Sequence, residues 1–188
     1  MTTESPNIKK FLSNLRNLDK VVRFSTLRRL KDENVAEHSF HAAFYAMILA
    51  DMEIKSGNKV DVEKVLRRAI MHDIEEALTG DVIYSFKYSE PGFSEKMKAM
   101  SLEFCKELLK DMPEFSDSYL NIWKDAKDST IEGKIVNAAD KLEALVYSLE
   151  EYSLGNKNFK PIIDSLLDIL KGIELESLKI FLSELKID

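Results

Sequence analysis

The chain has 188 residues, of which 45% are hydrophobic and 32% are charged, and its formal net charge at pH 7 is −6. This length suits one domain with a substantial core, and the composition is that of a folded protein rather than a disordered one. The acidic balance argues against a nucleic-acid-binding surface, and the longest apolar run, residues 42–50, is too short to cross a bilayer. The first residues show no secretion signal, so we expect a cytoplasmic protein with no membrane partner.

The apolar residues recur with helical spacing along almost the whole chain. Ser5 and Pro6 are typical of a helix start, and an apolar stripe follows them at Ile8, Phe11, Leu12, Leu15 and Leu18. A second helix is expected from Val35 into the low 50s. A third is expected to be capped by Asp61 and to stop near Gly80.

The second half of the chain is also predicted to be helical. Residues 81–94 have no helical period, so we expect a long loop there, which in a compact domain is often functional. Helix is expected again over about residues 95–110, and Ser129 and Glu132 have the spacing of a capping box for the next helix. Residues 154–158 interrupt the pattern, and Pro161 begins a final helical pair around Gly172. The prediction is one all-α domain over residues 1–188.

Two features of this helical pattern concern the core. The single cysteine, Cys105, lies among apolar residues at helical spacing, so we expect it to be buried, and no disulfide can form within the chain. The apolar residues of the final helical pair are compatible with either a dimer interface or closure of the core. They are Ile162, Leu166, Ile173, Leu178, Phe181 and Leu185.

Four polar residues fall within apolar helical segments. His72 and Asp73 end one apolar run, Asp140 lies inside another, and His38 lies on a helix rich in Ala, Phe and Met. An unpaired carboxylate is costly to bury, so four such residues are most simply explained if they meet at a cation. Two imidazoles and two carboxylates suit Co²⁺, Mn²⁺, Zn²⁺, Ni²⁺ or Fe²⁺ better than Mg²⁺. His41, one turn after His38, is expected to be structural.

Adjacent residues on a helix point about 100° apart, so His72 and Asp73 can share a metal only if it lies between their directions. Glu76 is four residues after His72 and three after Asp73, so on a continuous helix it projects beside both. Next to a metal, Glu76 is a candidate general acid or base.

The order and spacing of these residues resemble the HD-domain superfamily of helical, metal-dependent phosphohydrolases, and in particular its 5'-deoxynucleotidase YfbR branch. The matching motifs span about residues 15–155, ahead of the helical pair at about 161–187. They are Arg23-Phe24, Glu-Asn-Val-Ala-Glu-His ending at His38, His-Asp-Ile-Glu-Glu-Ala-Leu-Thr-Gly-Asp over residues 72–81, and Ala-Ala-Asp-Lys-Leu over residues 138–142.

The resemblance implies a role for each matching residue. His38, His72, Asp73 and Asp140 would bind one divalent metal, with Co²⁺ or Mn²⁺ favoured. Glu76 would be the catalytic acidic residue, Asp81 would be a second acid that contacts the substrate or aids the reaction, and Arg23 would orient the phosphate. The implied activity is removal of the phosphate from deoxyribonucleoside 5'-monophosphates by a metal-activated water. The resemblance further implies a homodimer.

Two departures from the family pattern bear on substrate choice. Phe24 stands where the bacterial enzyme has a tryptophan that helps to exclude the ribose 2'-hydroxyl, and residues 82–85 lack the family's proline. The alternatives are therefore a ribonucleotide-tolerant nucleotidase, a phosphodiesterase of the same superfamily, or a non-catalytic module that binds metal or nucleotide. A helical scaffold without metal would need Asp73 and Asp140 to be exposed or ion-paired.

Overall fold

The computed structural model describes residues 5–81 and 92–185, and in these ranges the chain forms helices and no strand. Val22 and Asn34 make one isolated antiparallel bridge. The all-α prediction is thus confirmed. In chain order the elements are α1 (Ile8–Leu15), η1 (Arg16–Lys20), α2 (Val35–Lys55), α3 (Val62–Met71), α4 (Glu76–Thr79), α6 (Phe93–Leu109), α7 (Ser116–Lys124), α8 (Ile131–Ser153), η2 (Lys157–Phe159), α9 (Lys160–Lys171) and α10 (Glu176–Glu184).

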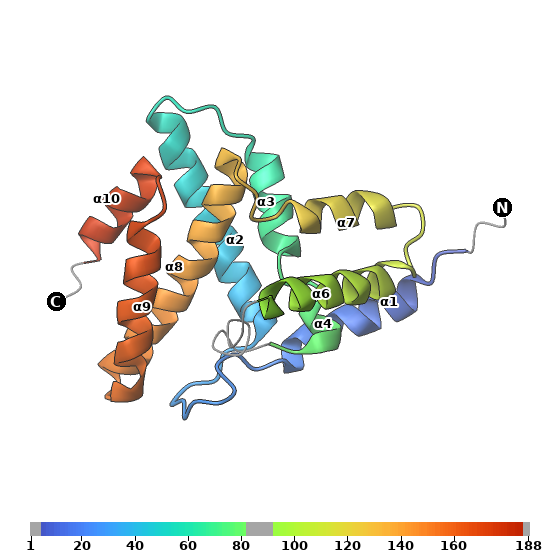
Figure 1. Cartoon of the computed structure of the whole chain (residues 1–188), viewed down its shortest axis with the longest axis horizontal. Coiled ribbons are helices and arrows are strands. Elements are labelled where there is room, and N and C mark those ends of the chain that lie inside the picture. The colour runs from blue at the N-terminus through green and yellow to red at the C-terminus, as the bar shows by residue number, and fades with distance from the viewer. Residues whose placement is uncertain (1–4, 82–91, 186–188) are drawn as a thin grey trace.

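The two longest helices, α2 and α8, pack against each other at the centre of the molecule (Figure 1). Helix α3 packs on both of them, α9 on α8 and α10 on α2. Their apolar faces form one core, which includes fully buried Leu49, Ile135 and Leu142. The six apolar residues predicted for the final helical pair, between Ile162 and Leu185, all belong to this core or pack against it, so they help to close the core. The predicted final helical pair is present as α9 and α10.

A second core lies between α1, η1, α4, α6 and α7, on the side of α3 away from α9 (Figure 1). It contains Phe11, Leu108 and the predicted buried cysteine, Cys105, which has no exposed surface. Burial raises the pKa of the Cys105 thiol to about 12, so the thiol stays neutral in the folded protein. None of the helices in the described ranges is both long enough and apolar enough for a transmembrane span.

Several helix boundaries agree with the sequence predictions. Helix α2 begins at Val35, and Asn34 and Glu37 form a complete capping box in front of it. Asp61 caps α3 by accepting a hydrogen bond from the Lys64 backbone N–H at 3.0 Å. The predicted break at residues 154–158 separates α8 from η2 and α9.

Other boundaries differ from the predictions. Asn7, rather than Ser5, caps α1 through the Lys10 backbone N–H. Thr130 caps α8, one residue later than the predicted Ser129, because Thr130 Oγ1 is the atom within hydrogen-bonding distance of the Gly133 N–H.

Helices α3, α6 and α7 also depart from expectation. Helix α3 ends at Met71 instead of continuing to Gly80, and a separate short helix, α4, precedes Gly80. Helix α6 starts at Phe93, two residues before the predicted start. Helix α7 was not predicted, although Tyr119, Leu120, Ile122 and Trp123 recur at helical spacing and pack against the second core. Most of the predicted loop, residues 82–91, lies outside the described residues.

Candidate metal centre

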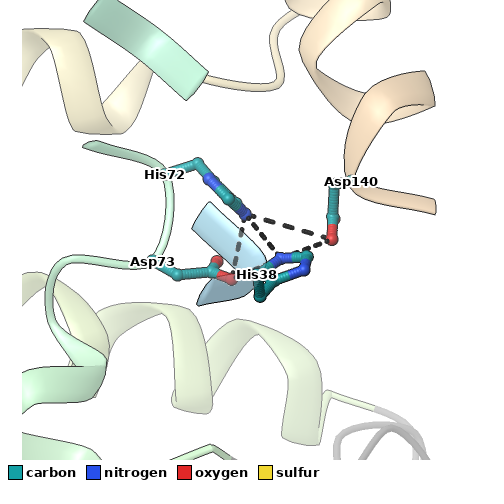
Figure 2. Close-up of side chains that lie close together, drawn as sticks. All are labelled: His38, His72, Asp73 and Asp140. Atoms are coloured by element: carbon teal, nitrogen blue, oxygen red, sulfur yellow. Dashed lines mark hydrogen bonds and ion pairs between the residues drawn. The ribbon is translucent and has the colours of Figure 1, made fainter. Parts of the chain in front are cut away.

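Four side chains from three segments of the chain converge at the centre of the molecule. Figure 2 shows His38 from α2, His72 and Asp73 from the turn after α3, and Asp140 from α8. Each offers one nitrogen or oxygen atom, and these four atoms lie within 4.8 Å of one another. The two histidine Nε2 atoms are 3.3 Å apart, and His38 Nε2 lies 3.5 Å from Asp73 Oδ2 and 3.4 Å from Asp140 Oδ1. The structure thus brings the four predicted residues together.

The end of α3 at Met71 explains how two consecutive residues can face one point. On a continuous helix, His72 and Asp73 would point about 100° apart. Here His72 is the C-cap of α3, and Asp73 lies in the turn that leads to α4. His72 Nε2 and Asp73 Oδ2 are consequently only 2.9 Å apart.

Both histidines have their second ring nitrogen occupied. His72 Nδ1 donates to the backbone carbonyl of Ala69 at 2.6 Å, and since a carbonyl oxygen only accepts, this nitrogen carries the proton. His38 Nδ1 is hydrogen-bonded to Glu143 Oε2. In a neutral imidazole the other nitrogen is then an acceptor, so both Nε2 atoms present a lone pair to the cluster.

The two aspartates each divide their oxygens between the cluster and a lysine. Asp140 Oδ1 faces the histidines, while Asp140 Oδ2 accepts from Lys127 at 2.5 Å and from Lys141 at 3.1 Å. Asp73 Oδ2 faces the histidines, and Asp73 Oδ1 is 3.9 Å from Lys127 Nζ. Burial alone would raise the pKa of both carboxyl groups, but His72 and Lys127 hold the pKa of Asp73 well below its usual range, and the two lysines do the same for Asp140.

Behind His38 lies a buried group of charges formed by Arg23, Glu33 and Glu143. Arg23 Nη1 donates to Glu33 Oε2 at 2.8 Å and to Glu143 Oε2 at 2.7 Å. Burial opposes the charge of Arg23, but the two glutamates raise its pKa above the ordinary value. Burial and the neighbouring Glu143 raise the pKa of Glu33 to about 8, whereas His38 and Arg23 lower that of Glu143 against the effect of burial. Arg23 thus lies in a turn, largely buried and ion-paired to two glutamates.

The two predicted acids have different surroundings. Glu76 is the first residue of α4 and is buried, and its charge contributes to the raised pKa of Lys127. Asp81 follows Gly80 and is partly exposed. Among the described residues, Asp81 makes no hydrogen bond or ion pair with the four-residue cluster. His41 is outside the cluster and half-exposed, with Nδ1 3.8 Å from Glu143 Oε1.

Phe24 is held in an unusual backbone conformation next to this site. Its φ is 51°, in the left-handed region that non-glycine residues seldom adopt. The Phe24 ring stacks on Tyr147, with centroids 5.4 Å apart and planes inclined by 8°, and meets the edge of Phe159 at 5.5 Å. The Arg23 guanidinium carbon lies 5.2 Å from the Phe24 centroid. Phe24 is therefore a fixed aromatic surface directly beside Arg23.

Sequence reasoning did not identify Glu33, Glu143 or Lys127 as members of the site. Glu143 carried a usable signal, because it follows Asp140 by three residues and shares its helix face. Glu33 lay within a quoted motif without an assigned role. Lys127 precedes α8 in a segment with no periodic pattern, so nothing in the sequence pointed to it.

Comparisons with known proteins agree with this geometry. A family model described as 5'-deoxynucleotidase YfbR-like matches residues 10–187. A 5'-deoxynucleotidase of Photorhabdus laumondii is 34% identical over 158 residues, covering 83% of this chain and 80% of that protein. A second one, from Vibrio vulnificus, is 33% identical over 151 residues, covering 79% and 78%.

Solved structures show the same fold. A crystal structure of an HD-domain phosphohydrolase from Listeria innocua matches with a TM-score of 0.85 at 28% identity, covering 94% of this chain and 86% of that one. The HD phosphohydrolase of cyanophage S-2L, solved with dA and one catalytic Zn²⁺, matches with a TM-score of 0.66 at 13% identity, covering 92% and 94%, and so supports the fold alone. The family match, the relatives and the fold together show that this chain belongs to the YfbR-like 5'-deoxynucleotidase family of HD-domain phosphohydrolases.

Proposed function

We propose that this protein hydrolyses deoxyribonucleoside 5'-monophosphates to a nucleoside and inorganic phosphate, with one divalent metal held by His38, His72, Asp73 and Asp140. The observation that carries the proposal is the convergence of these four ligand atoms within 4.8 Å. The names of the related Photorhabdus and Vibrio proteins support the choice of substrate.

The chemistry of the four residues fits a transition-metal ion. Two imidazole nitrogens with free lone pairs and two carboxylate oxygens suit Co²⁺ or Mn²⁺, with Zn²⁺, Ni²⁺ and Fe²⁺ as alternatives, better than Mg²⁺. The carboxylates of Asp73, Asp140 and Glu143 lie around the buried His38 ring, and their negative charge attracts a cation. When bound, the ion supplies a Lewis acid that lowers the pKa of water and neutralises phosphate charge.

Arg23 and Phe24 are proposed to position the substrate. A guanidinium has five N–H donors, and the two ion pairs of Arg23 both use Nη1, so donors remain for a phosphate oxygen. The stacked ring of Phe24 beside it offers a flat apolar surface to the sugar.

Glu76 and Asp81 are proposed to serve the reaction itself. Water attacks phosphorus as the bond from phosphorus to the 5'-oxygen breaks, and the departing oxygen must gain a proton. Glu76, buried at the start of α4, is the proposed source of that proton, either directly or through a water molecule. Asp81, at the end of the same motif, is proposed to contact the substrate.

The direct test measures phosphate release from dAMP and AMP by metal-stripped protein reloaded with Co²⁺ or Mn²⁺, with Asp73→Ala as the control. We expect metal-dependent release from dAMP that the substitution abolishes. Equal release from AMP would identify a ribonucleotide-tolerant nucleotidase. Conversion of cyclic AMP to AMP, followed by chromatography because this reaction releases no inorganic phosphate, would identify a phosphodiesterase. Absence of phosphate release from both dAMP and AMP, with metal bound, would overturn the proposed activity.

Assembly and location are further proposals. We propose a homodimer, because Phe40 and Phe44 leave a large part of their rings exposed on α2 and apolar surface of this kind is common at interfaces. Sedimentation analysis tests this, and a monomer at micromolar concentration would contradict it. A cytoplasmic location follows from the nucleotide substrate and is tested by cell fractionation.

A further inference from the structure

We propose that Glu143 is a positioning residue for the metal centre, which accepts a hydrogen bond from His38 Nδ1 and thereby directs His38 Nε2 at the metal. This inference rests on the proposed metal-dependent function. It assigns a role to a residue outside the four ligands and outside the motifs that the sequence analysis singled out.

The His38 ring is placed between Glu143 on one side and the other three ligands on the other. His38 has no exposed surface, so both ring nitrogens must find partners inside the protein. Nδ1 is hydrogen-bonded to Glu143 Oε2, while Nε2 lies 3.3 to 3.5 Å from His72, Asp73 and Asp140. A carboxylate only accepts, so it fixes the proton on Nδ1 and leaves the lone pair on Nε2.

Glu143 is itself held in place by burial and by Arg23. It is 2% exposed, and Arg23 Nη1 donates to the same oxygen, Oε2, that faces His38. Glu143 is three residues after Asp140 on α8, so one helix face supplies a ligand and the acceptor that orients another ligand. The His38 ring is thus set from a rigid core helix.

The two histidines differ in the acceptor that holds Nδ1. His72 is held in the same tautomer by the backbone carbonyl of Ala69, which is neutral. A carboxylate acceptor makes an imidazole more basic and strengthens its bond to a metal, and loss of such a partner costs about 10- to 100-fold in metal affinity. Glu143 therefore acts on the strength of metal binding as well as on ring orientation.

A purely structural role for Glu143 makes a different prediction. If Glu143 only neutralised Arg23, its loss would lower the free energy of unfolding and would leave the metal affinity of the folded protein unchanged. Metal affinity, measured apart from activity, therefore separates the two roles.

The matched pair of variants is Glu143→Gln and Glu53→Gln. Glu53 is also buried, on α2, where it accepts hydrogen bonds from the Ser177 backbone and hydroxyl at the far end of the helix from His38. Zn²⁺ affinity is measured by competition with a chromophoric chelator on metal-stripped proteins whose folding is checked by circular dichroism. We expect about 10- to 100-fold weaker binding for Glu143→Gln and wild-type binding for Glu53→Gln. Wild-type affinity in Glu143→Gln, or equal losses in both variants, would overturn the inference.

A measurement on the wild-type protein keeps the test valid even if Glu143→Gln does not fold. Nitrogen-15 NMR of the Zn²⁺-loaded protein, labelled at histidine, distinguishes a protonated from a metal-bound ring nitrogen. We expect His38 to show a protonated Nδ1 and a metal-bound Nε2. A metal-bound Nδ1 would overturn the role of Glu143 and leave the proposed function intact, whereas failure of the wild-type protein to bind Zn²⁺, Co²⁺ or Mn²⁺ would overturn both.

Discussion

Two groups of charged side chains flank the four-residue cluster, one buried behind His38 and the other at the outer oxygens of Asp73 and Asp140. The buried group joins Arg23 to two glutamates and has almost no contact with solvent. The outer group consists of Lys127 and Lys141, whose side chains are 32% and 27% exposed. One side therefore places carboxylates near the cluster and the other places ammonium groups there.

With carboxylates on one side and ammonium groups on the other, the site can attract a cation and still admit an anion. The carboxylate of Glu143 behind His38 increases the attraction for a metal and is itself buried. The lysines reduce the negative charge at the open side, where a phosphate would approach. The ion pairs that hold Glu143 in place are buried, and breaking them is costly. The ion pairs of the two lysines are partly exposed to solvent and contribute less to stability.

The largest expected effect is on stability, from Arg23→Met. The substitution leaves Glu33 and Glu143 buried without their cation, so the free energy of unfolding should fall by about 3–5 kcal/mol. Urea denaturation measures this. The control is Lys127→Met on the open side, where loss of a partly exposed ion pair should cost at most about 1 kcal/mol. Equal losses would contradict the distinction between the two sides.

The next effect concerns the segment that carries Lys127. Asp128 in this segment receives two hydrogen bonds from Arg68, at 2.9 and 2.8 Å, and packs so closely on Gly133 that an added Cβ would meet its backbone. Gly133→Ala should therefore lower the free energy of unfolding by about 1–3 kcal/mol through overpacking. Gly172→Ala is the control, since its nearest contact would be 3.3 Å from a single backbone oxygen. Thermal denaturation compares the two variants. An unchanged midpoint in Gly133→Ala would show that Asp128 can shift to accommodate the added methyl group.

A smaller effect, of opposite sign to that of Glu143→Gln, is expected for metal binding by Lys127→Met. The ammonium group occupies Asp140 Oδ2 and repels a cation at the cluster. Removing it should tighten Zn²⁺ binding by up to about fivefold, which corresponds to about 1 kcal/mol. Chelator competition at low and high salt measures this. Weaker binding in the variant would show that Lys127 supports the ligands rather than opposing the metal.

The smallest effect is confined to acid pH. Burial opposes ionisation of Asp128, but hydrogen bonds from Arg68 and Thr130 lower its pKa from 3.8 to about 2. Its folded pKa is below its unfolded value, so its contribution to stability is complete above about pH 4 and is lost as the pH falls towards 2. The difference in unfolding free energy between wild type and Asp128→Asn should shrink over that interval. A difference independent of pH would exclude this linkage.

The predictable parts of the fold and site are those with a regular apolar spacing or with a polar residue inside an apolar segment. The helices built on α2 and α8 were predictable because their apolar faces are continuous, and Asp140 was conspicuous because it interrupts one of them. The end of α3 was not predictable, since the apolar pattern continues through Ile74 and Ala77, which are buried after the chain has turned.

The remaining site residues depend on tertiary contacts. Arg23 and Glu143 are 120 residues apart in the chain and meet only in the folded protein. Lys127 reaches Asp140 from an irregular segment, where no spacing rule relates the two residues. Physical reasoning from sequence identifies residues that are costly to bury, but not the partners that offset the cost.

The most direct test of the account is the position of a bound metal. Crystals soaked in Zn²⁺ or Mn²⁺ and measured at the absorption edge of the ion give an anomalous difference map that locates it without reference to activity. The account predicts one peak surrounded by His38 Nε2, His72 Nε2, Asp73 Oδ2 and Asp140 Oδ1. A peak bound elsewhere, or no peak at these four atoms under conditions that saturate the protein in solution, would contradict it.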